Sequence, residues 1–196
     1  MSNIANFLYE VGMLKKTPRT GYQFLGSGKE SVADHSFRMA VIGYVMACEV
    51  DEVDTYKTVL MCLFHDFHEA RTGDQNYVNK RYNKIDEDRA LDDMTEKVPF
   101  GDDIKSIVDE FNEGETVEAL IAKDADQLDL IMELKEQADL GNSYANDWIF
   151  YAKKRLQTDG ARKLAEEILK TDHTDWWFHK KTDLWVNGPE NDKNSK

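Results

Sequence analysis

The stretch CLFHDFHEARTGD, residues 62–74, decides how the chain is interpreted, because it joins an apolar run to a dense group of ionisable side chains. Two histidines, two aspartates, a glutamate and an arginine follow directly behind Cys62, Leu63 and Phe64. Burying such groups without partners is costly. The stretch is therefore either the solvated end of a helix or a place where the protein interior needs these side chains as ligands.

The residues in and before this stretch have the spacing of a buried helix over residues 55–71. One stripe at helical spacing combines Val59, Leu63, Asp66 and Ala70, and a second apolar stripe lies well away from it. A helix that is apolar on most sides is buried. The histidines and acids of the opening stretch are therefore expected to enter the protein interior.

Helical periodicity also dominates the rest of the chain. A helix over residues 32–49 is predicted from a stripe at i, i+4, i+7 and i+11, made of His35, Met39, Ile42 and Met46. Further helices are expected over residues 2–14, 86–98, 103–113, 115–141, 144–158 and 160–171, with Ser2 as the cap of the first and Gly141 at the end of the helix over 115–141. Glycine and proline mark a loop over residues 15–31, and residues 72–84 form a polar connection. These patterns predict an all-α, single-domain helical bundle over residues 1–186, followed by a disordered tail at 187–196.

Composition narrows the class of protein. The chain has 196 residues and 41% hydrophobic content, which suits one folded domain. Its net charge of −13, from 25 basic and 38 acidic side chains, disfavours binding to nucleic acid or to an anionic membrane. Cys48 and Cys62 lie in apolar helical patterns and are interpreted as core thiols. With neither a signal-peptide pattern nor an apolar run of about 18 residues, a cytoplasmic protein is expected.

Three segments place ionisable residues inside apolar helical patterns. They are SVADHSFRMA with His35, LFHDFHEA with the doublet His65–Asp66, and AKDADQLDLIMEL with Asp124, Asp126 and Asp129. Imidazole nitrogens and carboxylate oxygens together suit Mn, Fe, Co, Ni or Zn ions, and a set without cysteine argues against a structural zinc site. Neighbours on a helix point about 100° apart, so His65 and Asp66 can hold one ion only where it lies over their shared edge. Ligands from two other helices would complete the site.

The order His35, then His65–Asp66, then a distant aspartate resembles the H…HD…D signature of the HD-domain metal-dependent phosphohydrolases. The blocks LKKTPRTGY, ESVADHSFRMA, HDFHEARTGD and IAKDADQLDLI resemble, in order and spacing, the 5′-deoxynucleotidase branch of that superfamily. They lie within residues 14–132, about two thirds of the chain. The resemblance implies an HD-type helical bundle with a central metal site.

The resemblance also implies roles for individual residues. It assigns His35, His65, Asp66 and Asp126 as ligands of one divalent transition-metal ion, with Mn, Co, Ni, Fe and Zn all open. By helical phase Asp124 lies on the side of Ile121 and Leu128 while Asp126 points nearly opposite. The choice of Asp126 therefore depends on the family pattern, and Asp124 is the alternative ligand.

Outside the ligand set, the resemblance implies that Glu69 is the catalytic acid or base. It associates Arg19 and Asp74 with the substrate site. The planar guanidinium of Arg19 can bind phosphate oxygens at two points. His68 is interpreted as a non-ligand.

These roles predict a cytoplasmic phosphomonoesterase of nucleotide metabolism that releases phosphate from nucleoside 5′-monophosphates, with deoxynucleotides as the implied preference. Two alternatives stay open: another HD chemistry, such as a phosphodiesterase, and a non-enzymatic module that binds metal or nucleotide. The family resemblance further suggests a homodimer. Asp129 is interpreted as a solvated residue or a partner of a ligand. The segment DHTDWWFHKK, with His173 and His179, is interpreted as a packing clamp or a dimer contact.

Overall fold

The computed structural model describes residues 1–178 and 185, so the predicted tail at 187–196 and His179 lie outside the described residues. Every regular element of the described part is helical, apart from one isolated bridge between Pro18 and Ser31. The elements are α1 (Ser2–Val11), η1 (Gly12–Lys15), α2 (Tyr22–Leu25), α3 (Val32–Cys48), α4 (Thr55–Phe64), α5 (Glu69–Thr72), α6 (Tyr77–Lys80), α7 (Glu87–Thr95), α8 (Gly101–Glu113), α9 (Val117–Asp139), α10 (Ala145–Lys153), α11 (Asp159–Lys170) and α12 (Asp175–Phe178). The predicted all-α class is confirmed.

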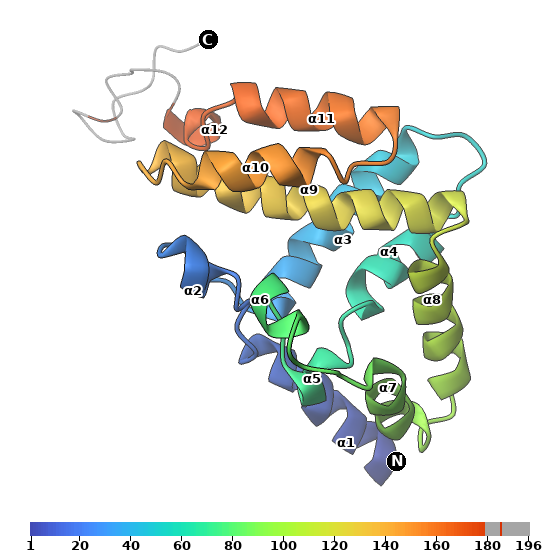
Figure 1. Cartoon of the computed structure of the whole chain (residues 1–196). Coiled ribbons are helices and arrows are strands. Elements are labelled where there is room, and N and C mark those ends of the chain that lie inside the picture. Colours follow the sequence, from blue (N-terminus) through green and yellow to red (C-terminus); the bar gives the residue numbers. More distant parts are fainter. Residues whose placement is uncertain (179–184, 186–196) are drawn as a thin grey trace.

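The long helix α9 organises the bundle (Figure 1). Helices α10 and α11 lie along it, and α3, α4 and α8 pack against it. Near the N-terminus of the chain, α1, α5 and α7 form a second group of helices. Its member α7 also packs against α8. Side chains on α9 such as Ala125, Leu128 and Ile131 are fully buried, and so are Asp124 and Asp129. A polar side chain that is buried in the middle of this helix therefore needs a hydrogen-bond partner.

Local sequence explains where α3 begins and how closely it packs. The Ser31 and Asp34 side chains form a capping box, which starts the helix one turn before His35. All four members of the predicted stripe on this helix are buried, so that stripe is confirmed. At Gly43 an added Cβ would lie 2.6 Å from the Cys62 sulfur, so only glycine allows α4 to approach α3 this closely.

The predicted helix over 55–71 is wrong in its second half. Helix α4 ends at Phe64, and the next residues make i→i+3 backbone bonds: Phe67 to Phe64 at 3.0 Å, Glu69 to Asp66 at 3.0 Å and Ala70 to Phe67 at 3.1 Å. These tighter turns change the direction of successive side chains compared with an α-helix. The His65–Asp66 doublet therefore projects from a turn at the end of a helix.

Smaller differences concern short elements and caps. Ser2 is the first residue of α1 and not its cap, because the N-cap position is Met1 and no side chain caps the helix. The predicted loop over 15–31 contains the short helix α2, and the predicted connection over 72–84 contains α6. The Asn76 side chain accepts from the backbone N–H groups of Val78 and Asn79 and so starts α6. Within the described residues, no helix is both long and apolar enough to cross a membrane.

Candidate metal centre and active site

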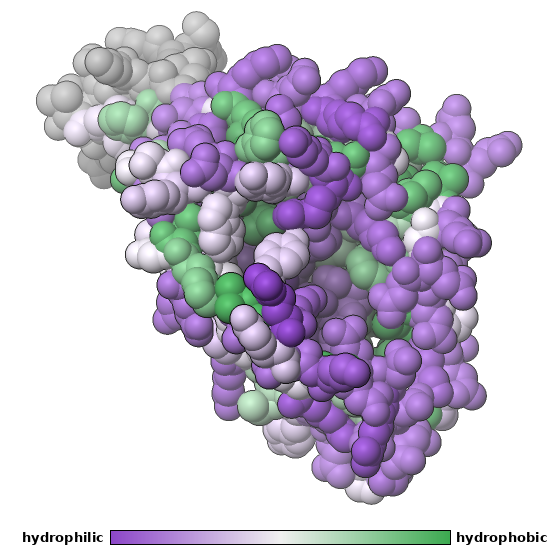
Figure 2. All heavy atoms as spheres, viewed as in Figure 1, coloured by the Kyte–Doolittle hydropathy of each residue, from purple (hydrophilic) through white to green (hydrophobic). Residues whose placement is uncertain are grey.

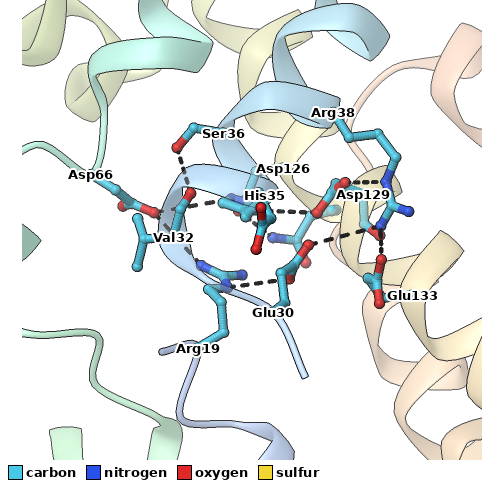
Figure 3. A network of polar contacts seen from close by, with 12 residues as sticks. Arg19, Glu30, Val32, His35, Ser36, Arg38, Asp66, Asp126, Asp129 and Glu133 are labelled. Carbon is cyan, nitrogen blue, oxygen red and sulfur yellow. Dashed lines mark hydrogen bonds and ion pairs between the residues drawn. The ribbon is translucent and has the colours of Figure 1, made fainter. Parts of the chain in front are cut away.

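The structure brings the four predicted metal ligands together from three parts of the chain. His35 comes from the first turn of α3, and His65 and Asp66 from the turn after α4, while Asp126 comes from α9. Figure 3 shows His35, Asp66 and Asp126 from close by. The His35 Nε2 atom lies 3.3 Å from Asp126 Oδ1 and 4.0 Å from Asp66 Oδ2. His65 Nε2 lies 2.9 Å from Asp66 Oδ2. Candidate ligand atoms of His35, His65 and Asp126 all lie within 4.8 Å of one another.

Asp124, the alternative ligand, points elsewhere. Its two oxygens accept from the backbone N–H groups of Gln157 at 2.7 Å and Thr158 at 2.8 Å. Both bonds tie α9 to the connection between α10 and α11, so the Asp124 carboxylate is already occupied. This placement favours Asp126 in the ligand set.

Two buried side-chain atoms in the described part of the chain have no hydrogen-bond partner, and both belong to predicted site residues. They are His35 Nε2 and Glu69 Oε2. Buried polar atoms are normally paired, so each unpaired atom suggests a missing ligand. An imidazole nitrogen beside another histidine and two carboxylates is a donor set that suits a divalent transition metal. The residues present therefore fit the implied ion.

The charges around this centre compensate one another. Burial favours the neutral form of Asp66, but His65, Arg19 and His35 outweigh it and hold the pKa of Asp66 well below its ordinary range. For Asp126, burial again opposes ionisation, and His35, Arg19 and His65 again lower the pKa well below its usual value. Burial and Arg19 lower the pKa of His35, but the neighbouring carboxylates of Asp126 and Asp129 raise it to about 10. Both site aspartates are therefore charged and ready to bind a cation.

Arg19 reaches this centre because its backbone is fixed beside the start of α3. Its N–H donates to the Glu30 carbonyl at 2.9 Å, next to the bridge between Pro18 and Ser31. The guanidinium lies 3.6 Å from Asp66 and 3.7 Å from Asp74. Burial lowers the pKa of Arg19, but the surrounding carboxylates raise it above its ordinary value, so the side chain remains a cation.

Glu69, at the start of α5, has a different environment from the two site aspartates. Its side chain is 7% exposed. Burial, together with the nearby charges of Asp66 and Asp74, raises the pKa of Glu69 to about 9. The carboxyl group therefore retains its proton at neutral pH and can donate it.

Asp74 is fixed in place by Thr20, which follows Arg19. The Thr20 backbone N–H and hydroxyl donate to Asp74 Oδ2 at 2.5 and 2.8 Å. The same hydroxyl accepts from the Asn76 backbone N–H at 3.0 Å. The two predicted substrate residues, Arg19 and Asp74, thus come from adjoining segments that are bonded to each other.

The other histidines of interest lie at the edge of the site or outside it. His68 is largely buried, and its Nε2 atom lies 3.8 Å from Glu87 Oε2. Burial lowers the pKa of His68. One of its ring nitrogens lies within 4.8 Å of oxygens of Asp66 and Glu69, so its non-ligand role stays a prediction. His173 contacts Asp139 at 3.3 Å near the end of α9.

Two residues of this network, Asp129 and Arg38, were not among the site residues predicted from the sequence. Asp129 is fully buried and lies 2.6 Å from His35 Nδ1, so it is not a solvated residue but a partner of a predicted ligand. Arg38, which donates to Asp129 at 2.5 Å, had no predicted role. The available signal was spacing: Arg38 follows His35 by three residues, as Asp129 follows Asp126, so each pair shares a helix face.

The surface near the site is hollowed and polar. Figure 2 shows hydrophilic residues over most of this face and a hollow between the positions that α6 and α8 have in Figure 1. The end of α4 lies behind this hollow. Solvent and a small charged substrate can therefore approach from this side.

Comparisons with known proteins agree with this geometry. Residues 11–168 match the HD domain family. The chain is similar to the 5′-deoxynucleotidase HDDC2 of Bos taurus, with 31% identity over 76% of this chain and 75% of that protein. The human protein of the same name is 30% identical over 70% of each chain. Among solved structures, a conserved hypothetical protein from Pyrococcus furiosus has a TM-score of 0.75 at 27% identity, covering 85% of this chain and 99% of its own. A protein from Archaeoglobus fulgidus has a TM-score of 0.60 at 30% identity, covering 90% and 100%.

Proposed function

The chain belongs to the HD domain family, and from this we propose that it is a metal-dependent phosphomonoesterase acting on nucleoside 5′-monophosphates, with deoxynucleotides preferred. Support comes from the relatives named 5′-deoxynucleotidases, which span most of both chains at about 30% identity. The products are a nucleoside and inorganic phosphate, which places the enzyme in nucleotide metabolism.

His35, His65, Asp66 and Asp126 would hold one divalent ion, with Mn, Co, Ni, Fe and Zn as the candidates. When bound, such an ion lowers the pKa of a water ligand and neutralises charge on the phosphoryl group. The protein's own part is to supply four ligand atoms from three separate segments. The unpaired Nε2 atom of His35 is the observation that carries the proposal, because a buried imidazole nitrogen without a partner suits a metal ligand better than a structural residue.

Arg19 binds the phosphate oxygens of the substrate. Its cationic guanidinium lies between Asp66 and Asp74, so it is oriented before the substrate arrives. A planar group with parallel N–H donors matches two phosphate oxygens at once. Asp74 holds the orientation of Arg19 and is itself held by Thr20.

Glu69 transfers the proton that the reaction requires. Its carboxyl group is protonated at neutral pH and has an unpaired oxygen. When the phosphorus–oxygen bond to the nucleoside breaks, this proton neutralises the departing 5′-oxygen as a hydroxyl group. The attacking water contributes its oxygen to the phosphate product, and its released proton restores Glu69.

We extend the proposal to a cytoplasmic homodimer in which residues 1–186 form one domain. Phe37, Val41 and Tyr44 make an exposed apolar stripe on α3, which supports association of two copies. Of the two expected core thiols only Cys62 is buried, since Cys48 at the end of α3 is exposed, and both are free cysteines, which supports a reducing compartment. Neither nucleic acid nor membrane is expected as a partner, because the net charge is −13. Sedimentation velocity of the wild-type protein and of Val41→Glu tests the dimer: we expect a dimer for the first only, and a monomeric wild-type protein contradicts it.

The function is tested by phosphate release from a panel of ribo- and deoxyribonucleoside 5′-monophosphates, repeated with Mn, Co, Ni, Zn and Mg. We expect release from deoxynucleotides that depends on a transition-metal ion. If the protein cleaves phosphodiesters but releases no phosphate from monoesters, the phosphodiesterase alternative is favoured. Tight nucleotide binding without phosphate release under every metal would favour the non-enzymatic alternative.

A further inference from the structure

The two ring nitrogens of His35 face two different carboxylates of α9. Its Nε2 faces Asp126 at 3.3 Å, on the side of the proposed metal site. Its Nδ1 lies 2.6 Å from Asp129 Oδ2, on the opposite side of the ring (Figure 3). A metal ion binds the neutral form of an imidazole, which carries one N–H and one free lone pair. Donation from Nδ1 to Asp129 therefore leaves the lone pair on Nε2.

Asp129 is in turn held by Arg38. The Arg38 Nε donates to Asp129 Oδ1 at 2.5 Å, so each oxygen of this fully buried carboxylate has its own donor. A second nitrogen of Arg38 donates to the Asp129 backbone carbonyl at 3.3 Å. The same nitrogen donates to Glu133 at 2.5 Å. Asp129 thus has no freedom to rotate away from His35.

The sequence spacing makes this arrangement a clamp between two helices. His35 and Arg38 are three residues apart on α3, while Asp129 and Glu133 are four residues apart on α9. Residues at these separations lie on one helix face. The two faces meet, as Figure 3 shows for all four side chains. Any rotation of either helix would move the His35 ring.

We propose that Asp129 and Arg38 are positioning residues, which fix the tautomer and the direction of the His35 ring so that Nε2 points into the metal site. The inference rests on the metal site of the proposed function but adds residues outside its ligand set. Carboxylates that accept from the second nitrogen of a metal-binding histidine commonly orient it and raise its basicity. A purely structural pair between α3 and α9 would stabilise the fold without affecting metal affinity, and this difference is measurable.

Two substitutions test the clamp at different points. Asp129→Asn keeps the shape of the side chain, but an amide offers one accepting oxygen where the carboxylate offers two, so either His35 or Arg38 loses its acceptor. Arg38→Met keeps most of the side-chain length and removes every donor. The Arg38 side chain is 25% exposed, so this variant is expected to fold even where the buried substitution does not.

Asp124→Asn is the matched control. Asp124 lies on the same helix as Asp129, is equally buried, and also accepts two hydrogen bonds, but its donors are backbone N–H groups far from His35 in sequence. A general loss of packing around α9 would affect this variant as much as Asp129→Asn. Urea unfolding of all variants shows which of them are folded under the assay conditions.

The measurement is Co²⁺ affinity of the full chain, by competition with a coloured chelator. We expect Asp129→Asn and Arg38→Met to bind Co²⁺ about 10- to 100-fold more weakly than wild type, and Asp124→Asn to bind equally. Affinity within twofold of wild type for the folded variants would overturn the proposal. In Zn²⁺-loaded protein labelled at its five histidines, we also expect the protonated Nδ1 signal of His35 to exchange faster with water in Arg38→Met. An unchanged signal would count against the clamp.

Failure of the clamp and failure of the proposed function give different results. If the wild-type protein binds Co²⁺ but releases no phosphate from any nucleotide, the function fails, and the affinity ratios still test the clamp. If phosphate release is normal and the Asp129 and Arg38 variants bind Co²⁺ as wild type does, the function stands and the clamp is wrong.

Discussion

Replacing Glu69 by glutamine separates proton transfer from metal binding. The carboxyl group is neutral in the folded protein at pH 7, since its pKa is raised to about 9, so a neutral amide of similar shape changes neither charge nor volume appreciably. We therefore expect the metal content and the fold to be retained. What is lost is the transferable proton, which typically costs about 100- to 10,000-fold in rate, or roughly 3 to 5 kcal/mol of barrier.

The assay is phosphate release from a deoxynucleoside 5′-monophosphate under saturating metal, together with the metal content of both proteins. A Glu69→Gln variant with wild-type turnover would remove Glu69 from the mechanism. A variant that loses its metal would show that Glu69 acts as a ligand instead, which would revise the ligand set around Asp66 and His68.

The same pair of proteins gives a pH-dependent prediction for stability. The folded pKa of Glu69, about 9, lies above the ordinary value of 4.5, so its protonated form stabilises the metal-free protein below pH 4.5. This contribution declines as pH rises towards 9, by about 1.4 kcal/mol per pH unit at most. Relative to Glu69→Gln, the metal-free wild type should lose stability between about pH 5 and 9 in urea unfolding. If the difference in free energy of unfolding between the two proteins does not change with pH, the raised pKa of Glu69 is contradicted.

Three further substitutions probe the framework. Asp124→Asn leaves one of two backbone N–H groups without an acceptor, so urea unfolding should show a loss of about 1–3 kcal/mol. Gly43→Ala places a Cβ 2.6 Å from the Cys62 sulfur and should destabilise by about 1–3 kcal/mol, with partial recovery in Gly43→Ala/Cys62→Ala. Thr20→Val removes the hydroxyl donor to Asp74 and should raise KM about 5- to 10-fold with a smaller change in kcat. These assignments are contradicted if Asp124→Asn or Gly43→Ala is as stable as wild type, or if Thr20→Val leaves KM unchanged.

Sequence periodicity predicted the long helices well and the turn after α4 poorly. Helix α3 has a strong cap at Ser31 and a regular buried stripe, so its bounds were accessible. The apolar pattern continues past Phe64 through Ala70 without glycine or proline, although the backbone changes there to i→i+3 bonds. The pattern contained no signal for that change. Helices α2 and α6 have four residues each, too short for any periodicity.

The site shows the same division between local and tertiary information. Residue types and order pointed to His35 and to the His65–Asp66 doublet. Helical phase, however, placed Asp124 and not Asp126 on the side of Ile121 and Leu128. Helix α9 is buried on several sides, so phase could not say which aspartate faces the other ligands. The role of Arg38 depends on how α3 and α9 meet, which no local pattern describes.

The single-ion site is tested most directly by measuring metal content and catalysis together. The protein is stripped with a chelator and titrated with Mn²⁺ or Co²⁺, while bound metal and phosphate release from a deoxynucleoside 5′-monophosphate are measured together. We expect no release from the stripped protein, release that rises in proportion to bound metal, and saturation at one ion per chain. Release without metal, or saturation only at two tightly bound ions, would contradict the single-ion site formed by His35, His65, Asp66 and Asp126.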